Sequence, residues 1–224
     1  MQAQDATTLF FLKLWPWIEA KKNQLIAAAV IIVIAGFAIW FLACQREAKT
    51  IAAGQALTQV VLSSGAPAAS DYFKIAEQHP GTAAGQRALL QGAAALFDAG
   101  KFADAQTQFQ KYLDAHPGSE LSGQAALGVA ACLDAQGKAD LAASAYQRVI
   151  SSAADTSIVS AAKFGQARIE ESQGRLNDAL GLYQDIANSE SGTTLGSEAR
   201  MCLMELMNKM PATTPAPTPA APLK

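Results

Sequence analysis

The residues able to do acid–base or nucleophilic chemistry are few in this chain of 224 residues, and they stand far apart. The only histidines, His79 and His116, both occur in the sequence His-Pro-Gly, at a step of 37 residues. Proline cannot continue a helix and glycine tolerates the turn that follows, so this sequence predicts a helix end. An imidazole there interacts favourably with the helix dipole. We therefore interpret both histidines as turn residues.

The carboxylates and cysteines do not form a catalytic or metal-binding arrangement either. Glu170 and Glu171 are the only adjacent acidic pair, and neighbours on a helix point about 100° apart, so they do not converge as general acid and base. Cys44, Cys132 and Cys202 are too scattered for a disulfide framework or a metal site. Cys132, which lies among alanines, is expected in the core.

The sequence also lacks the short motifs that accompany catalysis or nucleotide binding. It contains no Gly-rich phosphate loop, HExxH pattern, Cys-His pair or nucleophile elbow. The 17 basic and 19 acidic residues are intermixed, without the basic patch that nucleic acid requires. We expect no enzyme activity, catalytic residues, cofactor, metal, small-molecule substrate or nucleic-acid partner.

An internal repeat organises the elements of the chain. The stretch from Gly100 to Pro117 recurs at a step of 37 residues in both directions, and small residues recur at the same step upstream of it. The matching sets are Gly100, Ala105, Phe109, Tyr112 and Pro117; Gly137, Ala142, Tyr146 and Val149; Gly174, Ala179, Tyr183 and Ile186; Ala68, Tyr72, Ile75 and Pro80; and Ala56, Ala93, Ala130 and Ala167.

Each copy of the repeat predicts a helix hairpin. The apolar-periodic run Arg87 to Ala99 has small Ala93 at its centre, and Gly100 then suits a left-handed helix end. The second run, Phe102 to Ala115, carries Ala105, Phe109 and Tyr112 on one face of a helix. We interpret each unit as two helices, with the alanine of the first facing an alanine and an aromatic residue of the second.

This pattern resembles the tetratricopeptide repeats, in which a small residue in the first helix precedes Ala-x3-Phe and a closing proline in the second. That repeat is about 34 residues long, and the extra residues here fall in the connection after Pro117. The resemblance implies an all-α solenoid over residues 47–192. Its expected repeats are residues 47–81, 82–118, 119–155 and 156–192, and its first helix is residues 47–62.

The N-terminal region suggests attachment to a membrane. Residues 1–24 combine aromatic side chains with Lys21 and Lys22 and are interpreted as an interfacial segment, with a partner-binding segment as the alternative. Residues 25–44 are 20 uncharged residues, enough for a transmembrane helix of about 30 Å. We expect this helix to continue into the first repeat with little break.

Two points about this region stay open. Three lysines precede the apolar stretch and two basic residues follow it, a bias that favours a cytoplasmic N-terminus. Cys44 ends the stretch after Phe-Leu-Ala, so lipidation of Cys44 in a mature protein without the helix is the alternative to a retained span.

The C-terminal region predicts an end cap and a solvated tail. Residues 194–210 are apolar-periodic and are expected to form a helix that covers the last repeat. Its methionines are expected in the core, with an adaptable contact surface as the alternative. Residues 211–224 contain five prolines and are expected to be extended and disordered.

The family resemblance implies a binding groove lined by the first helices of the repeats. Its lining mixes apolar side chains with charges of both signs, which suits an amphipathic or extended peptide, although several of the apolar residues also fit a role in packing between repeats. The expected groove residues are Arg87, Leu90, Phe97, Asp98, Gln124, Leu127, Asp134, Phe164, Arg168 and Glu171, together with the smaller residues Ala94, Ala131 and Ala161.

The layout as a whole resembles the ancillary subunit family of the bacterial Sec translocon. That resemblance implies a single-pass protein of the inner membrane with a periplasmic repeat domain, which binds translocon components, chaperones or exported clients. The alternative is a structural repeat protein of envelope assembly or cell division, for which Cys44 could carry a lipid anchor. In both cases the expected function is a scaffold for protein–protein interaction.

Overall fold

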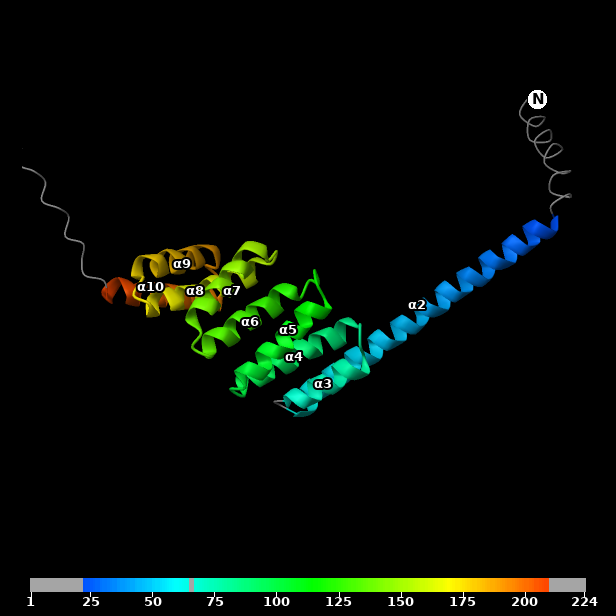
Figure 1. Ribbon diagram of the computed structural model, residues 1–224, viewed down its shortest axis with the longest axis horizontal. Coiled ribbons are helices and arrows are strands. Elements are labelled where there is room, and N and C mark those ends of the chain that lie inside the picture. The colour runs from blue at the N-terminus through cyan, green and yellow to red at the C-terminus, as the bar shows by residue number, and fades with distance from the viewer. Residues whose placement is uncertain (1–21, 65–66, 210–224) are drawn as a thin grey trace, which may run out of the picture. The chain divides into compact units, whose positions relative to one another are not determined.

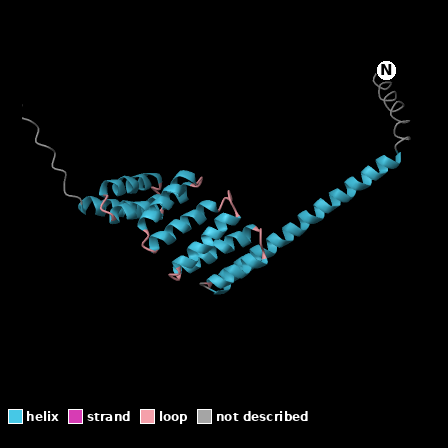
Figure 2. Cartoon of the chain, in the orientation of Figure 1, coloured by secondary structure: helices cyan, strands magenta, loops and turns pink. Residues whose placement is uncertain are grey.

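The regular elements of this chain are α-helices throughout the residues described by the computed structural model, 22–64 and 67–209 (Figures 1 and 2). The all-α prediction is confirmed for these residues. The expected interfacial segment lies outside them, apart from its last three residues, and so does the expected tail, residues 211–224.

The chain divides into two compact units, residues 1–55 and 56–224. In the first, α2 (Lys22–Ser64) begins, a helix of 43 residues. It includes residues 25–44 and 47–62 without a break between them, so the expected continuity of the helix over these residues is observed. Over the residues whose side chains the structure describes, which leave out 25–32 within α2, no helix is long and apolar enough to cross a membrane.

The second unit is an array of short antiparallel helices that follow one another in sequence (Figure 1). Each packs against the next, and α6 also packs against α4 and α8, so alternate helices line one side of the array. The helices are α3 (Ala69–Gln78), α4 (Ala83–Asp98), α5 (Phe102–Ala115), α6 (Ser122–Ala135), α7 (Ala139–Ser152), α8 (Thr156–Ser172), α9 (Leu176–Ser189) and α10 (Thr194–Lys209).

Glycines at the repeat step form the tight turn inside each hairpin. Gly100, Gly137 and Gly174 have φ of 74°, 73° and 77°, in the left-handed region that residues with a side chain rarely adopt. They connect α4 to α5, α6 to α7 and α8 to α9. The hairpins therefore owe their short connections to the glycines that mark the repeat in the sequence.

Adjacent hairpins are held together by an aromatic ring that packs against a glycine 19 residues further along the chain. A Cβ atom added to the glycine would approach the ring to 2.3–2.7 Å in each case, closer than any contact allows. At the fourth of these ring contacts, cysteine stands where the others have glycine: the thiol of Cys202 lies beside the Tyr183 hydroxyl. The pairs are Phe73 with Gly92, Phe109 with Gly128, Tyr146 with Gly165, and Tyr183 with Cys202.

The last helix, α10, begins a fifth copy of the repeat. The Thr193 hydroxyl accepts a hydrogen bond from the Gly196 amide at 3.1 Å, as the Thr82 hydroxyl does from the Gly85 amide at 3.0 Å, three steps earlier. Fully buried alanines mark the same position in four first helices: Ala88, Ala125, Ala162 and Ala199. α10 is therefore a first helix, and the described chain ends before any second helix of that copy.

The methionines of α10 are exposed, which corrects their expected place in the core. Met201, Met204 and Met207 are 61%, 59% and 59% exposed, because α10 packs on α9 with its other face, through Ala199 and Leu206. No helix among residues 67–209 lies where a second helix of the fifth copy would cover them. Met210 falls outside the described residues.

We expect Gly165→Ala to destabilise the array. The added methyl group would meet the buried ring of Tyr146, so the free energy of unfolding should fall by about 1–3 kcal/mol, as for an overpacked core. Thermal unfolding of the full chain in detergent, followed by circular dichroism, measures the change.

Gly181→Ala in α9 is the matched control, since no atom lies within 4 Å of the position of its Cβ. There the substitution should increase stability by about 0.5–1 kcal/mol, the usual gain of alanine over glycine in a helix. Equal stabilisation by both substitutions would show that the ring–glycine contact is not tight.

Candidate partner-binding groove

The faces of the first helices meet in one pocket at the junction of the second and third repeats. The pocket has a volume of about 240 Å³ and lies between α4 and α6, with one residue from α5. All but two of its lining residues belong to the set expected from the sequence; Phe109 and Gly128 are the additions. The lining consists of Leu90, Ala94, Phe97, Asp98, Phe109, Gln124, Leu127, Gly128 and Ala131.

The floor of this pocket is a product of the ring–glycine contact. Phe109 packs against Gly128, and since glycine has no side chain, the ring edge is left open to the groove. Leu90 adds to the floor but is only 3% exposed, so it belongs mainly to the core, the alternative role left open for the apolar groove residues.

The walls and rim of the pocket combine apolar and polar groups. Phe97 is half-buried and packs edge-on against Phe102, with ring centroids 5.1 Å apart. Leu127 is half-buried, while Asp98 and Gln124 are exposed at the rim. A cavity of about 150 Å³ lined by Leu, Ile and Phe holds benzene, so this pocket is large enough for one aromatic or branched aliphatic side chain.

The equivalent position one repeat later is more polar. Tyr146 packs against Gly165 there, in the place of Phe109 and Gly128. Burial, with a smaller contribution from the charge of Asp134, raises the pKa of Tyr146 to about 12, and Arg168 opposes this shift. The Tyr146 hydroxyl is therefore protonated at neutral pH, with two of the expected groove residues, Asp134 and Arg168, close to it.

A third equivalent position lies between α8 and α10. Phe164 packs edge-on against Tyr183, at 5.5 Å between ring centroids, and joins the second core cluster. The Tyr183 hydroxyl donates to Glu171 at 3.4 Å. Lys209 Nζ joins Glu171 Oε1 at 3.2 Å and Glu205 Oε1 at 2.8 Å. Burial, with nearby negative charge, raises the pKa of Tyr183.

α10 presents exposed residues at the repeat positions of the groove, and the expected set of groove residues did not include them. Glu198, Met201 and Glu205 stand three repeat steps after Arg87, Leu90 and Ala94, and Met201 and both carboxylates are exposed. Burial, followed by the charges of Glu198, Glu171 and Glu205, raises the pKa of the Cys202 thiol. Continuing the step of 37 residues beyond the fourth repeat would have found them.

The other expected groove residues differ in how far they are exposed. Arg87 and Arg168 are exposed, and Asp134 is half-buried. The structure therefore brings five of the expected residues around one pocket: Leu90, Phe97, Asp98, Gln124 and Leu127. Outside the pocket lie Arg87 and Asp134, on the same two helices α4 and α6, and Phe164, Arg168 and Glu171, on α8.

The two adjacent carboxylates, Glu170 and Glu171, lie in different environments. Glu170 is buried and accepts a hydrogen bond from Arg175, while Glu171 interacts with Tyr183 and Lys209. The two carboxylates thus have separate partners, as expected from their adjacency. Glu170 stands where earlier repeats have Leu96 and Leu133, and Arg175 stands where they have lysine.

Histidines and cysteines supply no further site. His79 and His116 are the C-cap residues of α3 and α5, and the His116 ring lies 4.9 Å from that of Tyr112. Cys132 is fully buried, and burial raises the pKa of its thiol to about 11. Within the part of the chain that the structure describes, no group of three or more His, Cys, Asp or Glu residues is arranged to hold a metal ion.

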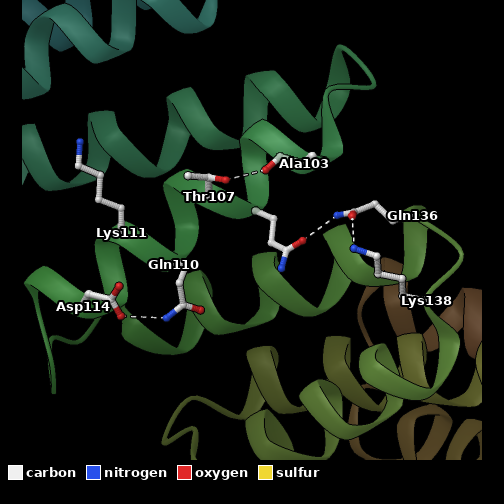
Figure 3. Close-up of a pocket in the computed structure, with 8 residues that line it drawn as sticks. Ala103, Thr107, Gln110, Lys111, Asp114, Gln136 and Lys138 are labelled. Atoms are coloured by element: carbon white, nitrogen blue, oxygen red, sulfur yellow. Dashed lines mark hydrogen bonds between the residues drawn. The ribbon is translucent and has the colours of Figure 1, made fainter.

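A second pocket, of about 550 Å³, lies over α5 and the turn between α6 and α7 (Figure 3). Its polar side chains hydrogen-bond to one another: Gln136 donates to Gln106 at 2.8 Å, and Lys138 donates to Gln136 at 2.8 Å. Gln110 donates to Asp114 at 2.9 Å. Because these polar groups satisfy each other, while the pocket between α4 and α6 is lined mainly by apolar side chains, the latter is the better candidate for binding.

Comparison with known proteins agrees with the repeat architecture. Residues 90–158 match the family model for the tetratricopeptide repeat, which is under half of the chain. The matched residues include α5, α6 and α7 and every residue that lines the pocket between α4 and α6. A search of curated proteins found no match to the chain.

We expect Arg175→Gln to destabilise the last hairpin, because it removes the cation beside buried Glu170. An unsatisfied buried polar group costs about 1–3 kcal/mol, and more if it is charged. Adding Glu170→Leu, which restores the leucine of the earlier repeats, should recover the lost stability. Lys138→Gln, at the equivalent position of the preceding repeat, is the control and should have little effect. Failure of the double variant to recover would contradict this account.

Proposed function

We propose that the chain is a membrane-tethered scaffold whose first helices form a groove for segments of partner proteins. The observation that carries this proposal is the apolar pocket between α4 and α6, open to solvent and rimmed by Asp98 and Gln124. Concave, mostly apolar sites with a few polar groups at the rim are typical of ligand binding. Helical repeat arrays use such surfaces to bind proteins.

The tether is proposed from the composition of α2. Residues 25–44 contain no charge and would form about 30 Å of helix, the thickness of a bilayer core. Val33, Ile34, Phe37 and Trp40 are 60–69% exposed, and side chains of this kind need an apolar environment. With more lysines before the apolar stretch than basic residues after it, we propose a cytoplasmic N-terminus and a periplasmic array in a bacterial inner membrane.

The partners that suit this arrangement are proteins that cross or enter the envelope. We propose an ancillary role beside the translocon, in which the groove holds chaperones or exported clients close to the membrane. The supporting argument is the continuity of α2, which runs from residues 25–44 into residues 47–62 without a break.

In-cell photo-crosslinking tests the groove. A photoreactive residue at Leu127, half-buried in the pocket, should give adducts with other proteins, identified by mass spectrometry. The same probe at Leu141, exposed on α7 and outside the pocket, should give at least several-fold fewer.

The identity of the adducts decides between the proposed roles. Translocon components, chaperones or exported chains would support the translocon role. Adducts only with envelope-assembly or division proteins would replace it with a structural role there. Equal adducts from Leu127 and Leu141 would remove the groove from the proposal.

Extraction of membranes at alkaline pH tests the tether. The full chain should stay in the membrane pellet, and the double variant Ile34→Lys/Phe37→Lys should be released, because lysine near a helix centre costs about 3 kcal/mol per residue on insertion. Leu141→Lys controls for added charge. Intact mass distinguishes a retained helix from lipidation, since lipidation at Cys44 would remove residues 1–43 and add acyl chains. Release of the wild-type chain would contradict a tether.

A further inference from the structure

We propose that the groove selects a partner segment with two chemically different ends: a bulky apolar side chain for the pocket between α4 and α6, and basic side chains for the acidic end formed by α8 and α10. This inference rests on the groove function proposed above. It adds the chemistry of the partner and the direction in which the partner lies.

From α4 to α10, each junction between neighbouring first helices has one aromatic ring. The junction of α4 and α6 is the only one of these where the ring is phenylalanine, Phe109, and it forms the apolar end. At the next two junctions Tyr146 and Tyr183 take the place of Phe109, and each brings a hydroxyl with charged neighbours. A large apolar side chain is therefore accommodated best against Phe109, Leu127 and Phe97.

The acidic end consists of carboxylates on two successive first helices. Glu198 and Glu205 stand four residues before and three residues after Cys202 on α10, and Glu171 lies on α8. Lys209 is shared between Glu171 and Glu205, and none of the ion pairs within residues 67–209 uses Glu198. Three carboxylates face Lys209 and Arg168, which also acts on the Tyr183 hydroxyl, so the charge that remains at this end is negative and basic side chains are its complement.

The middle of the groove separates the two ends without favouring either charge. Asp134 on α6 and Arg168 on α8 carry opposite charges and act on the Tyr146 pKa in opposite directions. An acidic segment would meet the carboxylates at α10, and a uniformly basic one would leave the apolar pocket empty. A segment with an apolar anchor and basic residues further along satisfies both ends.

The distance between the ends sets the spacing in the partner. Packed helices are about 8–10 Å apart, so the pocket between α4 and α6 lies roughly 20 Å from α10. An extended segment covers this in about six residues at about 3.3 Å per residue. We therefore expect lysine or arginine about six positions from the apolar anchor.

Fluorescence anisotropy with synthetic peptides on the full chain in detergent tests this inference. The first probe is a 12-residue peptide of Gly, Ser and Thr that carries one Phe and, six residues away, two Lys. The second replaces both Lys with Glu, and the third replaces Phe with Ser. We expect the first to bind at least tenfold more tightly than either of the others at low salt.

Variants of the chain assign each end of the peptide. Glu198→Gln/Glu205→Gln should reduce the preference for Lys over Glu at least fivefold without loss of the Phe requirement. Leu127→Ser should weaken the first and second peptides alike. Glu120→Gln, an exposed acidic residue before α6 and outside the groove, is the control and should change neither.

The outcomes separate this inference from the groove function. If the Lys and Glu peptides bind equally well and both need Phe, the groove function stands and the charge selection is overturned. If binding follows the Lys residues but ignores Phe and Leu127, the apolar anchor is overturned. If no peptide binds and Leu127 also gives no specific photo-crosslinks, the groove function itself fails.

Discussion

The contact on which the repeat array depends is an aromatic ring packed against a residue with little or no side chain in the next first helix. Phe73, Phe109 and Tyr146 each lie on a glycine 19 residues later. Glycine costs helix stability, but here it removes the Cβ that would keep the ring away. The helices can approach closely because the ring fills the space between them, and dispersion and burial stabilise the contact.

The same contact makes the groove. Phe109 and Gly128 pack against each other between repeats and both line the pocket, so the floor of the pocket and the joint between repeats are one structure. Leu90 illustrates the consequence, since it lines the pocket yet is almost completely buried. Substitutions on the floor therefore affect stability as well as binding, while Leu127 and the rim are freer to vary.

The sequence predicted the hairpins well because their signals are local: turn glycines at a fixed step and one apolar face per helix. It missed the ring–glycine pairs because they join different repeats, and because the step is not uniform. Phe73, and not Tyr72 of the repeat alignment, contacts Gly92, and Gly128 follows Gly92 after 36 residues. It misplaced the α10 methionines because periodicity shows an apolar face but not whether another helix covers it.

The groove positions that recur at the repeat step are of two kinds. One kind has an apolar residue in every repeat, and the other has a residue type that changes along the array. Leu90, Leu127, Phe164 and Met201 keep one row apolar from α4 to α10. Three residues before this row, the side chain changes from basic to acidic along the array: Arg87, Gln124, Ala161 and Glu198. Four residues after it, the side chain changes from small to charged: Ala94, Ala131, Arg168 and Glu205. This apolar row continues past the pocket between α4 and α6, so apolar contact alone leaves the direction of a bound segment undetermined. The flanking residues differ at each repeat, so they can determine the register and the direction of a bound segment. Specificity in such an array therefore comes from the positions whose residue type changes between repeats.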